Sequence, residues 1–157
     1  MRITLFRPLL LAGLAATLLG AAPVRVANPL TFLNYLVGTW SCSSTVGGTT
    51  TTYTARYEYA LGGKWLRTIN SSKRYSSEDM MTYSGHRWTV IDMEPTGMSS
   101  VLLAPDTGAA HIAFTTAYPK PGLNVTYDRL STAKYTLTFS GTAGGKPANW
   151  KDVCTKR

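Results

Sequence analysis

Residues 38–46, GTWSCSSTV, and residues 149–155, NWKDVCT, decide the predicted fold, because they are the first and last predicted strands and each holds one cysteine. Cys42 and Cys154 are the only cysteines of the chain. In an exported protein two thiols predict one disulfide, which places the first strand beside the last. Free, redox-active or metal-binding thiols are the alternatives. An all-β chain whose first and last strands are neighbours forms a closed barrel.

The first 27 residues have the pattern of an export signal. Arg2 and Arg7 provide the positive start, and Leu9 to Leu19 form an apolar run that is too short to cross a bilayer. Cleavage is predicted after Ala22 or after Ala27, and the sequence leaves both sites open. We therefore expect a secreted or periplasmic protein without a transmembrane segment.

The rest of the chain, residues 28–157, is long enough for one domain with a buried core. Without Arg2, Arg7 and Arg25 the formal charge falls from +8 to +5, a modest surplus that does not indicate nucleic-acid binding. Threonine, tyrosine, glycine and serine are abundant, which is typical of a β protein. One short helix is predicted over residues 29–37, where it would cover a barrel end.

Strand-like runs and turn signals alternate from residue 38 onward. A polar stretch, residues 72–79, is predicted to be a link between strands. The tight turns favour a single closed antiparallel up-and-down barrel of about 8–10 strands over a Greek-key sandwich. The predicted strands are residues 38–46, 50–61, 64–71, 80–85, 86–94, 98–104, 110–118, 123–130, 134–141 and 149–155.

Alternation within these strands predicts which side chains share a face. We expect a ligand pocket lined by large aromatic side chains and one arginine, which would orient a carboxylate or phosphate. The alternative is that the same aromatic side chains simply fill the core. A slip of one residue in a strand would invert the assignment of its faces. The predicted pocket lining is Tyr53, Tyr57, Tyr59, Trp65, Arg67 and Trp88.

Gly38-Thr39-Trp40 opens the first predicted strand directly after the short helix, and residues 57–66 read YEYALGGKWL. The three-residue motif resembles the G-x-W signature of lipocalin-like (calycin) barrels. The wider pattern is similar to small bacterial proteins of the DUF1579 type and the nitrobindin-like type. The resemblance implies an antiparallel barrel with an interior pocket. It also implies that Gly38 and Trp40 close the barrel, with a basic side chain stacked on the tryptophan. The candidates for that side chain are Lys151, Lys156 and Arg157.

Nitrobindin-like proteins bind haem through a histidine, and this chain contains His86 and His111. His111 is the better candidate for a ligand-binding residue, because its neighbours on the same strand face, Ala113 and Thr115, are small. A haem-binding barrel with one of these histidines as axial ligand is therefore an alternative function. The other interpretation is that both are surface or hydrogen-bonded strand residues, and no other cofactor is predicted.

Asp92 and Glu94 are two residues apart in a predicted strand, so both project from one face, about 7 Å apart. Paired carboxylates are suited to acid–base chemistry. Because these two precede the turn Pro95-Thr96-Gly97, we expect them on the solvent-exposed rim instead.

The sequence predicts an exported barrel that binds a small apolar or amphiphilic molecule in its lumen. Three alternatives remain: the haem-binding barrel, a barrel enzyme that uses carboxylates and tyrosines, and a structural, envelope-associated module with a solid core. The expected partner is a small molecule and not a nucleic acid. The ligand and the oligomeric state are left open.

Overall fold

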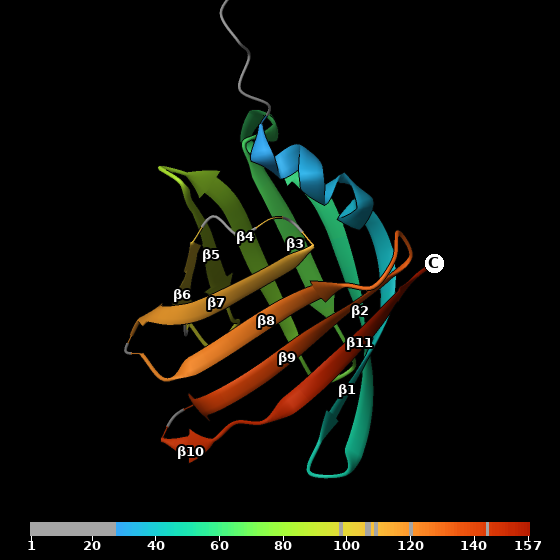
Figure 1. The fold of residues 1–157 in the computed structure, drawn as a ribbon. Coiled ribbons are helices and arrows are strands. Elements are labelled where there is room, and N and C mark those ends of the chain that lie inside the picture. The colour runs from blue at the N-terminus through green and yellow to red at the C-terminus, as the bar shows by residue number, and fades with distance from the viewer. Residues whose placement is uncertain (1–27, 98, 106–107, 109, 120, 144) are drawn as a thin grey trace, which may run out of the picture.

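The computed structural model describes residues 28–97, 99–105, 108, 110–119, 121–143 and 145–157 (Figure 1). The predicted export signal, residues 1–27, lies outside the described residues, as does Met98 at the start of a predicted strand. Among the described residues, no helix is long and apolar enough to cross a membrane.

The helices are η1 (Pro29–Leu36) and η2 (Leu61–Gly63), and the strands are β1 (Gly38–Val46), β2 (Thr49–Ala60), β3 (Trp65–Ser71), β4 (Ser76–Ser84), β5 (Arg87–Met93), β6 (Ser99–Pro105), β7 (His111–Tyr118), β8 (Leu123–Arg129), β9 (Lys134–Ala143), β10 (Lys146–Pro147) and β11 (Trp150–Lys156).

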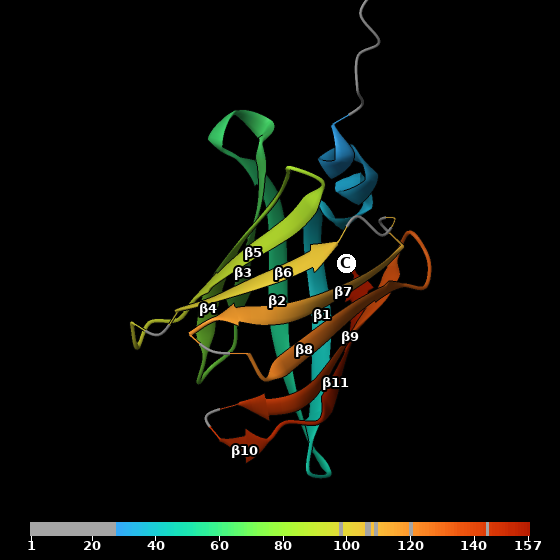
Figure 2. The same cartoon turned by 60° about the vertical axis from the view of Figure 1, so that its left-hand side comes forward.

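The strands form one antiparallel sheet that closes on itself (Figures 1 and 2). Strands β1 to β9 pair in chain order, β11 lies between β9 and β1, and the short β10 is attached to β9. The pairing of β8 with β9 makes the barrel wall continuous. The predicted closed up-and-down barrel is therefore confirmed.

One predicted link is in fact part of a strand. Residues 76–79, Ser-Ser-Glu-Asp, have the composition of a loop, yet they form the first part of β4. They pair with β3 from Ser71 opposite Ser76 to Thr68 opposite Asp79. Since β4 borders a polar part of the barrel interior, polar side chains are compatible with a strand there.

The expected disulfide is present between Cys42 of β1 and Cys154 of β11. The two residues are directly opposite in the register of these strands, and both are buried. The bond therefore lies in the seam where the last strand meets the first.

Helix η1 covers one end of the barrel, which we call the helix end (Figure 1). The predicted helix forms as a 3₁₀ helix, and its side chains of Leu30, Leu33 and Leu36 are buried. Their spacing of three residues places them on one face of a 3₁₀ helix. Asn28 caps the helix by accepting a hydrogen bond from the Leu30 backbone N–H. We call the opposite end of the barrel, which η1 leaves uncovered, the open end.

Trp40 and Lys156 hold η1 against the barrel. The indole Nε1 of Trp40 donates a hydrogen bond to the Leu36 carbonyl oxygen at 2.6 Å. Lys156 Nζ lies 5.5 Å from the centroid of the Trp40 ring and donates to the Tyr35 carbonyl oxygen at 2.8 Å. Gly38 connects η1 to β1 with φ +123°, a conformation that residues with a side chain rarely adopt. Among the three candidate basic residues, Lys156 is the one placed over Trp40.

Candidate functional site

The interior near the helix end is a packed aromatic core. Tyr135 contacts Trp40 edge-on, with ring centroids 4.8 Å apart, and stacks on Tyr127 at 4.9 Å. The hydroxyls of Tyr57 and Tyr135 are hydrogen-bonded at 2.7 Å. All four side chains are buried, so this half of the interior is filled by the protein itself.

Four of the six predicted lining residues project to the inner side of the barrel. Tyr53 and Tyr57 lie on the inner face of β2, and Trp88 is buried on the inner face of β5. Tyr59 is at the helix end, where its hydroxyl donates to the Leu30 carbonyl oxygen at 3.0 Å and also bonds to the Asn34 side chain. Tyr59 therefore belongs to the contact with η1.

The expectation that Trp65 and Arg67 face the lumen is wrong. Inward-facing Tyr57 is opposite Thr68, and outward-facing Glu58 is opposite Arg67, so the odd-numbered residues of β3 point outward. Arg67 forms ion pairs on the outer face with Glu58 at 3.3 Å and with Glu78 at 2.6 Å. Because both faces of β3 contain apolar residues, composition did not distinguish them.

The expectation of a luminal His111 is also wrong. Its side chain is 62% exposed on the outer face of β7, and its Nδ1 lies 2.6 Å from Asp128 Oδ1. His86 is exposed in the turn between β4 and β5, with φ +59°. Neither histidine faces the barrel interior, so neither is placed to bind a haem there.

The interior near the open end is polar along β2 to β6. Tyr53, Asn70, Asp79, Asp92 and Ser100 are only partly buried, in contrast to the core at the helix end. Solvent therefore reaches this part of the interior. We use the name polar cluster for the inward-facing side chains Tyr53, Asn70, Ser77, Asp79, Asp92, Ser100 and Asp152.

Asp79 and Asp92 form a carboxyl pair at the centre of the polar cluster. They are directly opposite in the register of β4 and β5. Asn70 Nδ2 donates to Asp79 Oδ2 at 2.9 Å, and Ser100 Oγ donates to Asp92 Oδ2 at 3.3 Å. Burial, and then the hydrogen bond and charge of Asp92, raise the pKa of Asp79 well above its usual range. The pair therefore favours a state in which Asp79 keeps a proton and shares it with Asp92.

Asp152 adds a third carboxyl group from β11. Its side chain is only 5% exposed, and Tyr53 donates a hydrogen bond to its Oδ2 at 2.8 Å. Its Oδ1 has no hydrogen-bond partner among the described residues. Burial raises the pKa of Asp152, against the smaller, lowering effects of side-chain hydrogen bonds from Ser44 and Tyr53. Burial, and then the charge and the hydrogen bond of Asp152, raise the pKa of Tyr53.

Charged groups are divided between the two ends of the barrel. Lys156 and Arg129 lie at the helix end, where the Arg129 guanidinium is 4.1 Å from the centroid of the Tyr35 ring. The three interior aspartates lie toward the open end, and in the described part of the chain no ion pair joins them to a basic group. The described residues also contain no group of three or more acidic, histidine or cysteine side chains arranged to hold a metal.

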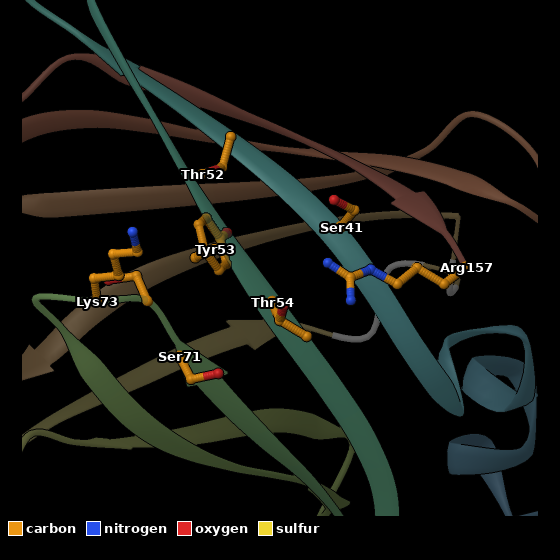
Figure 3. A pocket seen from close by; sticks show the side chains of 8 residues that line it. Ser41, Thr52, Tyr53, Thr54, Ser71, Lys73 and Arg157 are labelled. Carbon is orange, nitrogen blue, oxygen red and sulfur yellow. The ribbon is translucent and has the colours of Figure 1, made fainter.

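Two surface hollows lie outside the lumen. One, of about 300 Å³, follows the outer face of β1 to β3, where Ser41, Thr54 and Ser71 lie with Lys73 and Arg157 (Figure 3). The other, of about 280 Å³, is beside the open end and includes Ser77 of the polar cluster in its lining.

Sequence reasoning missed the partner of Asp92. It paired Asp92 with Glu94 on the rim, whereas the structure pairs Asp92 with Asp79 inside the barrel. The sequence predicts a link that includes Asp79, and no sequence pattern singles out Asp152. The inner face of β4 carries Ser77, Asp79, Met81 and Tyr83, and this alternation could have predicted the strand. Because its first two members are polar, the hydrophobic pattern alone does not reveal it.

Replacing Asp79 with asparagine is expected to make the unfolding free energy less dependent on pH. Because the folded-state pKa of Asp79 is raised, the wild type loses stability as pH rises from about 4 through that pKa, at up to about 1.4 kcal/mol per pH unit. The substituted amide does not titrate, so D79N should gain stability relative to wild type over the same range. Urea unfolding at a series of pH values tests this. Glu94→Gln, on the rim, is the control, and parallel curves for D79N and wild type would contradict the prediction.

Comparison with known proteins finds no family model that matches this chain and no curated protein that matches it. The closed antiparallel barrel is consistent with a lipocalin-like fold. The narrower likeness to DUF1579-type or nitrobindin-like proteins stays a prediction from Gly38-Thr39-Trp40 and residues 57–66.

Proposed function

We propose that this protein is an exported barrel that binds a small amphiphilic molecule in its interior, through the open end. The observation that carries the proposal is the partly exposed polar cluster, which lies next to a buried apolar interior. Ligand sites commonly combine an apolar lining with a few polar groups that orient the ligand. The disulfide is in keeping with an oxidising compartment such as the periplasm or the extracellular space.

The apolar part of the ligand would contact side chains on β8, β9 and β11. Leu123, Leu137 and Phe139 are only partly buried although they pack against the core. Phe139 stacks on Trp150 with ring centroids 4.4 Å apart. Covering such surface contributes about 25 cal/mol per Å² of apolar area removed from water.

The polar part of the ligand would meet an interior group that lacks a protein partner. Asp152 Oδ1, in the polar cluster, has no hydrogen-bond partner in the described structure. A buried polar group without a partner costs about 1–3 kcal/mol. Hydrogen bonds from a ligand or from water would remove this cost.

The carboxyl pair favours one second candidate, an enzyme that uses acid–base catalysis. Asp79, whose pKa is raised, is suited to donate a proton to a bound molecule, with the Asp92 carboxyl group directly opposite it. In that case the wild type would turn over a bound molecule and D79N would not.

Native mass spectrometry of the protein purified from its own secretion route tests the proposed function. We expect a retained small-molecule mass, and the chain mass will show whether cleavage follows Ala22 or Ala27. Ser100→Trp should remove the bound mass by filling the open end, because Ser100 faces inward. Ser99→Trp is the matched control, since Ser99 is the exposed neighbour in β6. A bare wild-type mass that also fails to take up alkyl-chain probes would overturn the proposal.

A further inference from the structure

We propose that the polar group of the ligand is a cation, a protonated amine, which the interior carboxyl groups of Asp79, Asp92 and Asp152 attract into the open end. This inference rests on the proposed function and specifies its ligand class. It follows from the hydrogen-bonding pattern, the burial of Asp152 and the distribution of charge along the barrel.

The polar cluster offers acceptors to a ligand. Asn70, Ser100 and Tyr53 each direct a donor to one aspartate oxygen, at 2.9, 3.3 and 2.8 Å. These neutral donors orient the carboxyl groups and bring no positive charge to them. An ammonium group has three donors and no acceptor, so it complements the remaining carboxyl oxygens.

Asp152 is the feature that distinguishes this cluster from an ordinary acidic surface. Its side chain is more than nine-tenths buried, it projects from the inner face of β11, and Oδ1 has no partner among the described residues. A buried carboxylate is normally paired with a cation or fully hydrogen-bonded. The other carboxylate oxygen of Asp152, Oδ2, accepts the hydrogen bond from the Tyr53 hydroxyl at 2.8 Å.

The interior carboxyl groups oppose an anionic ligand beside them, while two basic residues of the open end, Lys73 and Arg74, lie in the exposed turn between β3 and β4. Lys156 and Arg129 are held at the helix end by contacts with Trp40 and Tyr35. The described ion pairs bring no basic group to the interior aspartates. A carboxylate or phosphate headgroup would therefore be repelled, whereas an ammonium group would form charge-assisted hydrogen bonds.

The test compares dodecylamine, dodecanol and dodecanoate, which share one apolar chain, in calorimetric titrations of the mature protein at neutral pH and below micellar concentrations. We expect dodecylamine to bind at least about tenfold more tightly than dodecanol, and dodecanoate to bind most weakly. Non-specific electrostatic attraction would instead favour dodecanoate over dodecylamine, because the protein is positively charged. The chain carries a formal charge of +8, or +5 without the three arginines of the predicted signal.

Two substitutions locate the binding site. Asp152→Asn and Asp92→Asn should each remove the preference for the amine, and the partly exposed Asp92 keeps the test valid if the buried Asp152 variant does not fold. Asp128→Asn, on the outer face, is the control and should keep the preference. Equal or tighter binding of dodecanol or dodecanoate, or an amine preference that survives Asp92→Asn, overturns this inference but leaves the proposed function standing. No binding of any of the three overturns both.

Discussion

Replacing Cys42 and Cys154 together with alanine is expected to lower the free energy of unfolding by about 4–5 kcal/mol. The disulfide closes a loop with a sequence separation of 112 residues, and in the chain-entropy model a loop of this length restricts the unfolded chain strongly. Since small proteins are commonly stable by only about 5–15 kcal/mol, the variant would be close to marginal stability. Denaturant unfolding with and without a reducing agent measures the difference.

A matched pair in the same seam separates the crosslink from the strand pairing. Ser41 and Thr155 are opposite each other in β1 and β11, one position before Cys42 and one after Cys154, on the outer face. Replacing both with alanine should change the stability by much less than removing the disulfide. An unchanged unfolding midpoint after full reduction of the wild type would show that the strand pairing alone maintains the closed barrel.

Raising the pH above about 10 is expected to unfold the barrel cooperatively. Burial raises the pKa of Tyr57, Tyr127 and Tyr135 above that of tyrosine in an unfolded chain, which is about 10. The folded state therefore keeps three phenolic protons that the unfolded state loses, so stability is fully present below pH 10 and falls above it. Each of these tyrosines contributes a loss of about 1.4 kcal/mol per pH unit, or about 4 kcal/mol per unit for the three.

Parallel measurements of tyrosinate absorbance and circular dichroism test this expectation. Ionisation of the interior tyrosines should coincide with loss of the β signal. Tyr127→Phe should move the alkaline midpoint to higher pH, because it removes one buried ionisable group. Tyr118→Phe, at an exposed position, should leave the midpoint unchanged. Ionisation of Tyr127 without unfolding would contradict the prediction.

The alternation of strands and turns could be recognised from the sequence because its signals are local. The first predicted strand, residues 38–46, agrees with β1 at both ends, where Gly47-Gly48 supplies the following turn. The inner face of β2 could also be identified, since Tyr53, Ala55 and Tyr57 alternate with threonine and charged residues. The closed barrel followed from adding the two cysteines to this pattern.

The faces of β3 depended on information that the strand itself does not contain. Leu66 and Thr68 point inward while Trp65 and Arg67 point outward, although the outward side contains the larger apolar residue. Pairing with β2 sets this orientation, and Arg67 gains carboxylate partners from β2 and β4. The role of Arg67 therefore changes from ligand binding to an ion pair on the surface.

Strand periodicity, turns and cysteines are properties of short segments, so the amino-acid sequence was sufficient to predict an all-β barrel whose two ends meet at a disulfide. The position of the polar cluster depends instead on how the strands assemble. Asp79 and Asp92 come together through the pairing of β4 with β5, and Asp152 comes from the distant β11. The raised pKa values of Asp79 and Asp152 arise first from burial by the assembled barrel, which no single strand produces.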